Sequence, residues 1–251
     1  MSQVIILTGA SRGLGLAIAH YLLQRQHNLV VVARSEQPLR DLEKQYKSQV
    51  AVLAADLADL SIGQKAVDLA KERFSRLDGV IINHGVLDPV ARVADGDAER
   101  WRAAFDINFF SAVSLTSAAV PLLREAKGKI IMTSSGAAAS AYPTWGAYGS
   151  AKAAMNHLAA TLGSEEKDIV TVCIRPGTVD TEMQREIREK HNSVMEADHV
   201  KYFANLKSSN GLLAPELPGY VIARLVLGAT QELSGKFLEW KAEELRTFQQ
   251  D

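Results

Sequence analysis

The stretch "TGASRGLG", residues 8–15, decides the fold. It follows the apolar run "QVIILT" (3–8) and opens the helical pattern "GLGLAIAHYLLQRQ" (13–26). Its glycines, Gly9, Gly13 and Gly15, are spaced G-x3-G-x-G, which permits a tight turn and close approach of a phosphate to the backbone. The helix that follows offers unpaired N–H groups and the positive end of its dipole. A lone glycine motif is weak evidence, but one between a first strand and a first helix predicts a dinucleotide site.

Apolar runs and helical patterns alternate along the whole chain. The apolar runs are nearly continuous, which is typical of parallel strands covered on both faces. The alternation predicts an α/β fold, a Rossmann-like doubly wound parallel sheet of about seven strands with helices on both faces. Strands are expected over 3–8, 29–33, 50–55, 79–83, 128–134, 169–175 and 236–240, and helices over 13–26, 37–47, 59–75, 97–125, 147–166 and 216–228.

The domain organisation follows from length and pattern. The 251 residues show no internal repeat, low-complexity segment or linker, so residues 1–251 are expected to form a single dinucleotide-binding domain. Between about 181 and 213 the sequence becomes polar, charged and irregular, with scattered Met, Tyr and Phe. We expect this segment to be a helical excursion outside the sheet that covers the substrate.

Composition narrows the class of function. With 28 basic and 29 acidic residues and no run of Lys and Arg, the chain lacks the charge pattern of a nucleic-acid binder. No run reaches the roughly 18 apolar residues of a membrane helix, and "VIILTG" near Met1 is too short for a secretory leader. Cys173 is the only cysteine, so no intrachain disulfide forms; we expect a small buried hydrophobe and a cytoplasmic protein. No metal is expected.

The residues after the second predicted strand indicate which cofactor is preferred. An NAD-binding fold usually has an acid about 20 residues past the glycines. Here Arg34, in "VVARSE" (31–36), comes 19 residues after Gly15. A guanidinium can pair with a 2′-phosphate, and Arg12 and Ser35 can add a cation and a hydroxyl. The pattern favours NADP(H) over NAD; the alternatives are a solvated Arg34, or NAD held through Glu36.

The third strand ends in "AADLAD" (54–59), with Asp56 at its carboxyl end. Asp56 can accept a hydrogen bond from an adenine amino group. It can also cap the following helix, a role for which Asp59 is better placed.

Three motifs in chain order, "TGASRGLG", "YGSAK" (148–152) and "RPG" (175–177), resemble those of the short-chain dehydrogenase/reductase family over nearly the whole chain. The glycine spacing and the length argue against the family's longer epimerase-like branch, and the chain most resembles its NADPH-dependent carbonyl reductases. The C-terminal third resembles sepiapterin reductase and fungal benzil-reductase-like proteins. The resemblance implies a reductase that transfers hydride from NADPH to a ketone, a diketone or a pterin side chain.

The resemblance also implies a catalytic set. Tyr148 and Lys152 match the family's Y-x3-K pair, and Ser135 lies 13 residues before the tyrosine, with Ser134 as the neighbouring alternative. Asn108, in "FDINFFS", matches the asparagine of the long helix. The implied cofactor contacts are Gly9, Ser11, Arg12, Gly13, Leu14, Gly15, Arg34, Ser35, Asp56, Leu57, Asn83, Gly85, Tyr148, Lys152, Pro176, Gly177, Val179 and Thr181.

The chemistry of these residues suits carbonyl reduction. A tyrosine with a pKa of about 10 is an available acid at neutral pH. Lys152 lies four residues from Tyr148, on the same helix face, and its ammonium is expected to lower the pKa of the phenol. Ser135 can donate a hydrogen bond to the substrate oxygen, and Asn108 can hold a water that links Lys152 to solvent. Alone, Ser135 and Asn108 would be interpreted as capping or turn residues.

One motif departs from the family pattern. The family shows N-N-A-G after the fourth strand, whereas this chain has "INHG" (82–85), with Ile82 and His84 in place of an asparagine and an alanine. This puts the polar bracing of the central sheet in doubt. His84 either lines the cleft or fills it.

Candidate substrate contacts are mostly aromatic. Trp145, Met183, Tyr202 and Glu239 are predicted to join Ser135 and Tyr148 at the substrate, with Tyr142 and Phe203 as further wall candidates. The apolar members are equally consistent with core positions. Glu239, in "SGKFLEW" (234–240), matches the pterin-anchoring acid of sepiapterin reductase, or is an exposed edge-strand glutamate.

Two other functions stay open. The same residues serve an alcohol dehydrogenase working oxidatively, and the fold also carries non-enzymatic NADPH-binding proteins. The partners expected are a small-molecule carbonyl substrate and a second copy of the chain, with no nucleic acid and no membrane. The family pairs through two long helices, here 97–125 and 147–166. Trp101, Phe105 and Phe109 face such a partner or the core.

Overall fold

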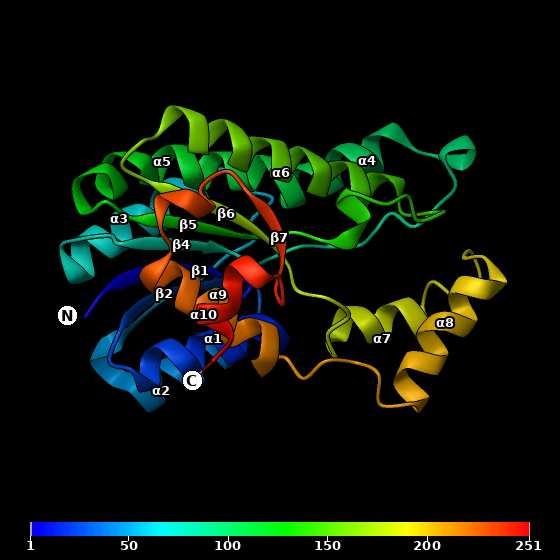
Figure 1. The fold of residues 1–251 in the computed structure, drawn as a ribbon, viewed down its shortest axis with the longest axis horizontal. Coiled ribbons are helices and arrows are strands. Elements are labelled where there is room, and N and C mark those ends of the chain that lie inside the picture. The colour runs from blue at the N-terminus through cyan, green and yellow to red at the C-terminus, as the bar shows by residue number, and fades with distance from the viewer. Residues whose placement is uncertain (1, 251) are drawn as a thin grey trace.

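A seven-stranded parallel sheet forms the centre of the protein in the computed structural model, which describes residues 2–250 (Figure 1). The strand order is β3-β2-β1-β4-β5-β6-β7, and all neighbouring pairs are parallel. Each predicted apolar run forms a strand, which confirms the doubly wound fold. The strands are β1 (Val4–Thr8), β2 (Asn28–Ala33), β3 (Val50–Ala54), β4 (Gly79–Ile82), β5 (Lys129–Thr133), β6 (Val170–Arg175) and β7 (Phe237–Glu239).

Helices cover both faces of the sheet because successive strand residues point to opposite sides. In β1, Ile5 and Leu7 pack into the core with α1 (Gly13–Gln24), α2 (Glu36–Tyr46) and α9 (Glu216–Gly228). Val4 and Ile6 pack into the second core, with α3 (Ile62–Phe74), α5 (Ser111–Ala126) and α6 (Gly146–Glu165). The two layers lie below and above the sheet in Figure 1. Helix α9 has the predicted bounds, 216–228.

The strand order reverses between β1 and β4. From β1 the chain adds β2 and β3 on one side of the sheet, and from β4 it adds β5, β6 and β7 on the other side. In open α/β sheets, ligands bind in the crevice outside the carboxyl ends of the strands at such a point. The turn after β1 and the "INHG" segment after β4 therefore meet at the edge where a cofactor is expected.

The predicted long helix over 97–125 is three segments. Asp97 caps α4 (Ala98–Phe105) by accepting from the N–H of Glu99, and a π turn, Asp106–Phe110, then leads into α5. By length and composition, Ala98–Ala126 is long and apolar enough to cross a membrane, which the sequence did not indicate. Core helices pass the same test, and α5 buries Ala112, Leu115, Ala119 and Leu123 against the sheet.

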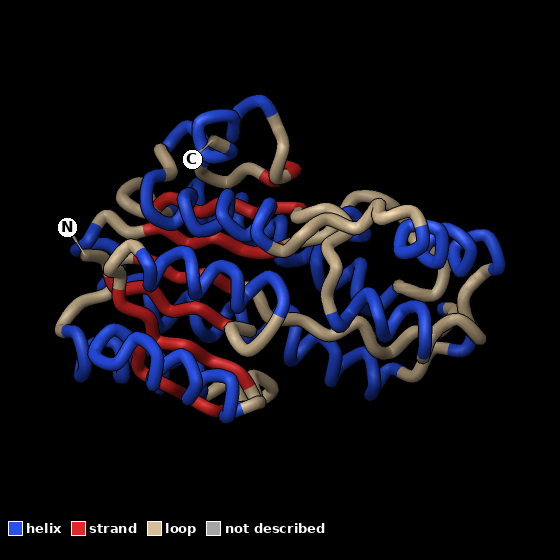
Figure 2. The backbone as a smooth tube through the Cα atoms, turned by 90° about the horizontal axis from the view of Figure 1, so that it is seen from below, coloured by secondary structure: helices blue, strands red, loops and turns tan. Residues whose placement is uncertain are grey.

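The segment over 181–213 contains α7 (Glu182–Glu189) and α8 (Ala197–Ser208). They project beyond the sheet at the lower right of Figure 1, and Figure 2 shows the same helices past the ends of the strands. The chain returns where Leu213 pairs with Val179. After α9 and β7, a short α10 (Arg246–Gln249) packs against α9.

Candidate active site

A cleft of about 800 Å³ opens at the carboxyl ends of the strands. Among residues 2–250, no group of His, Cys, Asp and Glu is placed to hold a metal ion. Most of the predicted site residues line the cleft: Gly9, Ser11, Arg12, Gly13, Leu14, Gly15, Arg34, Ser35, Asp56, Leu57, Asn83, Gly85, Ser135, Trp145, Tyr148, Lys152, Pro176, Gly177, Val179, Thr181 and Met183.

The glycine turn has the conformation that the spacing predicts. Gly9 and Gly13 have φ angles of +67° and +52°, in the region that favours glycine. Gly15 lies against the backbone of the same turn, since a Cβ there would be 2.0 Å from the carbonyl oxygen of Gly9. Helix α1 begins at Gly13, so its N-terminal N–H groups lie at the cleft.

Two arginines, Arg12 and Arg34, line the cleft. Arg34 follows β2, is exposed and lines the cleft, and it pairs with no carboxylate between residues 2 and 250. Arg185, and to a lesser degree Arg12, lower the pKa of the Glu182 carboxyl. The carboxylate of Glu36 is instead held by Arg40 on α2, with Oε1 3.0 Å from Nε. Glu36, the acid through which NAD binding stayed an alternative, is therefore paired with Arg40 on α2.

Asp56 and Asp59 have different local roles. Asp56 lines the cleft, and its Oδ1 accepts from the N–H of Ala58 at 3.0 Å. The Oδ1 of Asp59 accepts from the N–H of Ser61, the residue before α3, at 2.9 Å. Asp59 therefore braces the turn before α3 but does not cap the helix as predicted, since the N-cap is Ser61; Asp56 remains at the cleft.

Tyr148 and Lys152 are both buried on the inner face of α6. The Lys152 Nζ lies 5.9 Å from the centroid of the Tyr148 ring and donates to the carbonyl of Thr133 at 2.9 Å. Burial lowers the pKa of Lys152 to about 8. Burial also raises the pKa of the Tyr148 phenol, which a hydrogen bond with Ser135 only partly offsets. The direction is opposite to the expected one, because desolvation of the phenolate is the largest effect on this pKa.

The two adjacent serines differ in their hydrogen bonds. Ser135 Oγ accepts from the N–H of Ala137 at 3.2 Å, so it caps the turn over 136–138, and it lies near enough to the Tyr148 phenol to lower the pKa of that group. Ser134 Oγ is buried and has no partner within residues 2–250. Of the two, Ser135 is the one that contacts the tyrosine.

Asn108 is fully buried in the π turn and lies behind the cleft wall. Its Oδ1 accepts from the N–H of Val86 and its Nδ2 donates to the carbonyl of Val86, both at 2.9 Å. A Cβ at Gly85 would lie 3.0 Å from this Oδ1 and 3.5 Å from the Nζ of Lys152. Glycine at position 85 therefore lets the amide and the ammonium lie close together.

The "INHG" segment braces the central sheet. Asn83 N–H donates to Thr8 Oγ1 at 3.0 Å, and Asn83 Oδ1 accepts from Thr133 Oγ1 at 3.2 Å, which ties the ends of β1, β4 and β5 together. His84 adds a bond between its Nδ1 and Thr8 Oγ1 at 2.8 Å. The bracing that Ile82 put in doubt is therefore present. The departure from the family motif drew attention to His84, but no sequence pattern predicted its contact with Thr8.

Trp145 stands at the centre of an aromatic stack. Tyr142 covers one face of the indole at 5.1 Å between centroids and Phe203 stacks on it at 5.6 Å, both within 17° of parallel. Tyr148 meets it edge-on at 6.2 Å. With two rings stacked on it, Trp145 is buried, and it still lines the cleft. Further apolar residues that the sequence missed line the cleft: Leu87, Ile107 and Ile187.

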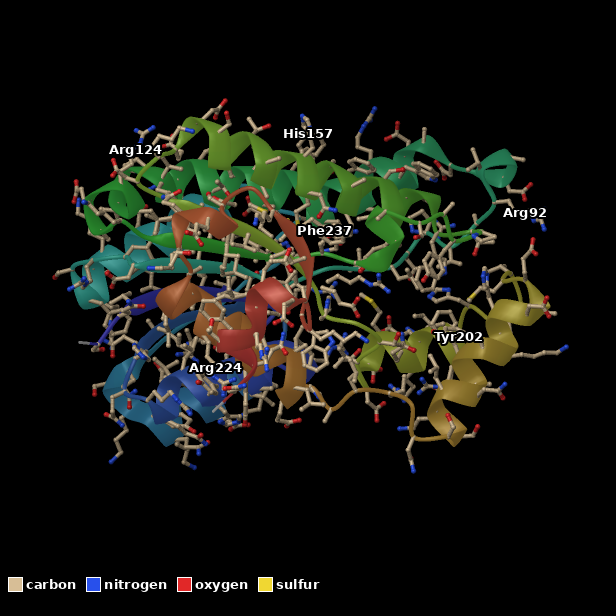
Figure 3. The ribbon with its side chains drawn as sticks, viewed as in Figure 1. Arg92, Arg124, His157, Tyr202, Arg224 and Phe237 are labelled. Carbon is tan, nitrogen blue, oxygen red and sulfur yellow. The ribbon has the colours of Figure 1, made fainter. Side chains whose placement is uncertain are left out.

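Two predicted substrate contacts lie away from the cleft. Tyr202 is 50% exposed on α8, where it touches Phe203 edge-on (Figure 3). Glu239 forms an ion pair with Lys241, with 3.7 Å between Oε1 and Nζ, on the last strand. Neither residue is among those that line the cleft. Trp101 packs on Gly146 at the start of α6, which supports the core interpretation of this side chain.

Comparisons with known proteins show which proteins this chain resembles. The family model described as short chain dehydrogenase matches residues 3–192. An uncharacterized oxidoreductase of Schizosaccharomyces pombe is 43% identical over 242 residues, covering 96% of this chain and 97% of the relative. The benzil reductase ((S)-benzoin forming) of Saccharomyces cerevisiae is 38% identical over 258 residues, covering 98% of each chain.

A solved structure shows the same arrangement over the full length. The crystal structure of a short chain dehydrogenase/reductase from Saccharomyces cerevisiae superposes with a TM-score of 0.97 at 38% identity. The match covers 99% of this chain and all of that chain.

Proposed function

The chain belongs to the short-chain dehydrogenase/reductase family of oxidoreductases, and from that premise we propose that it is an NADPH-dependent carbonyl reductase of ketones and diketones such as benzil. One observation carries the proposal: Tyr148, Lys152 and Ser135 meet in the same cleft as the glycine turn. The proposed acid Tyr148, the cation Lys152 and the glycine turn therefore line one cleft, which a single bound cofactor could fill.

The residues of the cleft fit NADPH. At Gly9, Gly13 and Gly15 an added side chain would meet neighbouring atoms of the protein at 3.0 Å or less. The turn therefore has no side chains at these positions, and a phosphate can approach its backbone. Arg34 pairs with no carboxylate between residues 2 and 250 and can meet a 2′-phosphate, and Arg12 and Ser35 also line the cleft. Pro176, Gly177, Val179 and Thr181 line it as well.

The chain's own residues supply the proton and orient the carbonyl. Bound NADPH supplies the hydride. The Tyr148 phenol donates its proton to the carbonyl oxygen, and the Ser135 hydroxyl donates a hydrogen bond to the same oxygen. Lys152, as a cation, stabilises the phenolate left on Tyr148. Asn108 holds the water from which the proton is replaced.

The apolar lining favours a hydrophobic dicarbonyl over a pterin. Leu87, Met183 and Ile187 line the cleft and pack in one apolar cluster with Trp145, whereas Glu239, the expected pterin anchor, is outside the cleft. A relative bears the name benzil reductase. Alcohol oxidation would use the same residues in reverse, and the proposed NADPH preference favours the reductive direction.

A substrate panel tests this assignment. NADPH is mixed with the protein and benzil, sepiapterin or a simple ketone, and absorbance of the reduced cofactor is followed. We expect turnover with benzil to exceed turnover with sepiapterin. Absence of turnover with every carbonyl, although NADPH binds, would instead favour a non-enzymatic NADPH-binding protein.

We expect Arg34→Ala to weaken NADPH binding by roughly 10- to 100-fold, the loss of one charge-assisted contact. Affinity for NADH, which lacks the 2′-phosphate, should stay nearly unchanged. Fluorescence titration of the ligand-free protein with each cofactor measures both. Arg73→Ala, an exposed arginine at the end of α3 outside the cleft, is the matched control. Equal losses for the two cofactors would refute the 2′-phosphate role.

The pH dependence of reduction should follow Lys152. Its pKa is lowered to about 8, so the side chain is a cation below that pH and becomes neutral above it. Tyr148, whose pKa is raised, keeps its proton throughout this range. Because kcat/KM reports the free enzyme, kcat/KM for benzil should fall as pH rises through about 8. A profile that stays flat well above that pH contradicts a catalytic role for the Lys152 cation.

The homodimer and the cytoplasmic location stay predictions. Phe105 and Phe109 contact each other edge-on, and the neighbouring Phe110 is 43% exposed where α5 begins. This side of the long helices is the surface through which we propose that two copies pair.

A further inference from the structure

His84 is a buried titratable residue that the mechanism above does not use. It follows β4, at the position where the family pattern has alanine, and its side chain is 9% exposed. A buried imidazole needs hydrogen-bond partners, and the identity of these partners indicates its role.

All polar contacts of His84 reach other segments of the site. Its Nε2 lies 2.9 Å from the carbonyl oxygen of Ile107 and 2.7 Å from Ser111 Oγ, and its Nδ1 lies 2.8 Å from Thr8 Oγ1. A carbonyl can only accept, so Nε2 carries the proton. Nδ1 then accepts from the Thr8 hydroxyl at 2.8 Å, in place of the longer bond of 3.2 Å that this hydroxyl can donate to the carbonyl of Ile81. The ring is neutral in this state, and burial lowers the pKa of His84 to about 4. It therefore holds the same bonds across the neutral range.

The bond to Ile107 holds the π turn, Asp106–Phe110, in place. π turns widen a helix and occur often at functional sites. Asn108 comes directly after Ile107, and Val86 comes two residues after His84. The side chain of Asn108 is bonded twice to the backbone of Val86. These four residues, His84, Val86, Ile107 and Asn108, form a two-point clamp between the "INHG" segment and the long helix.

The clamp lies next to Lys152. Gly85 stands between His84 and Val86 in the chain, and a Cβ there would meet both Asn108 Oδ1 at 3.0 Å and Lys152 Nζ at 3.5 Å. Without the His84 bond, the side-chain hydrogen bonds left to the π turn are those between Asn108 and Val86 and the one from the Ser111 hydroxyl to the carbonyl of Ile107, at 2.6 Å. The amide could then shift along the helix axis relative to the ammonium.

We propose that His84 is a positioning residue for carbonyl reduction, which acts through Ile107 to hold Asn108 beside Lys152. The proposal rests on the proposed function, because it assigns His84 a part in the same proton delivery. His84 does not touch the cofactor or the substrate carbonyl in this role. His84 stands where the family pattern has alanine. Its side chain connects the end of β1, through Thr8, and the π turn, through Ile107, to the segment after β4.

The kinetic test compares two substitutions at this position. His84→Leu fills a similar volume with no hydrogen bond, whereas His84→Gln retains a donor that can reach Ile107. A misplacement of about 1 Å can reduce rate by roughly 100-fold. We expect His84→Leu to lower kcat by 10- to 100-fold per NADPH-binding site, with KM for NADPH nearly unchanged, and His84→Gln to recover most of the loss. His157→Leu, an exposed histidine on α6 (Figure 3), is the control.

A structural test does not depend on turnover. Hydrogen exchange of the Val86 amide in the ligand-free protein reports its bond to Asn108. We expect faster exchange in His84→Leu than in the parent protein, and parent-like exchange in His84→Gln. Unchanged exchange and unchanged kcat in His84→Leu would overturn the inference. So would equal losses in the two variants. A parent protein that turns over no carbonyl would count against the proposed function, and the exchange data would still decide whether the clamp exists.

Discussion

Tyr148→Phe is expected to lower turnover of benzil by roughly 10²- to 10⁴-fold, the usual contribution of a general acid. Phenylalanine retains the ring, its edge contact with Trp145 and its place on the inner face of α6. Only the hydroxyl is lost, and with it the proton source and the hydrogen bond with Ser135. NADPH should bind with little change, since the phosphate turn and Arg34 are untouched. Initial rates and a fluorescence titration measure both quantities.

Tyr142→Phe is the matched control for this substitution. It removes a hydroxyl from the neighbouring aromatic residue, which stacks on Trp145 through its ring. We expect near-parent kcat. If Tyr148→Phe kept a comparable rate, the proton would come from another group and the proposed mechanism would be wrong.

Gly15→Ala should abolish detectable NADPH binding and destabilise the protein by roughly 1–3 kcal/mol, as overpacking does. The added Cβ would lie 2.0 Å from the carbonyl oxygen of Gly9 and 2.7 Å from Asn83 Nδ2. The Gly9 backbone cannot easily withdraw, because its N–H is bonded to the carbonyl of Val32 at 2.8 Å. Helix propensity alone predicts the opposite sign, a gain of about 1 kcal/mol for alanine. The sign of the change in unfolding free energy therefore decides which effect dominates.

Gly228→Ala provides the comparison for this change. Gly228 ends α9, and the nearest atom to an added Cβ there is Phe248 Cε1 at 3.7 Å, an ordinary contact. We expect unchanged or slightly raised stability and normal cofactor binding. Denaturant unfolding of both variants, with cofactor titration, completes the test. Normal NADPH affinity in Gly15→Ala would show that the turn does not hold the phosphates.

The fold was largely predictable because its elements depend on local pattern. Continuous apolar runs mark strands that are covered on both faces, and all seven were located. The π turn at 106–110 was not predicted, since the helical period continues through it and its cause is tertiary. The carbonyl of Ile107 is held by His84, which is 23 residues away in sequence. A contact between residues this far apart in the chain cannot be predicted from a local sequence pattern.

The candidate site was predictable where spacing along one element determines geometry. Tyr148 and Lys152 share a helix face, and Ser135 follows a strand whose end lies at the cleft. Residues whose placement depends on packing were harder to place. Trp145 has stacked neighbours contributed by a loop and by α8, and Tyr202 projects from α8 while Phe203 beside it is buried. The direction of the Tyr148 pKa shift likewise depends on burial, which the sequence does not reveal.

The most direct measurement of the central claim follows the hydride itself. NADPH deuterated at both C4 positions of the nicotinamide is incubated with the protein and benzil, and the benzoin formed is analysed promptly by mass spectrometry. We predict one deuterium per benzoin molecule, on the carbinol carbon, and almost no benzoin with Tyr148→Phe. Benzoin without deuterium, or no benzoin from protein that binds NADPH, would contradict an NADPH-dependent carbonyl reductase.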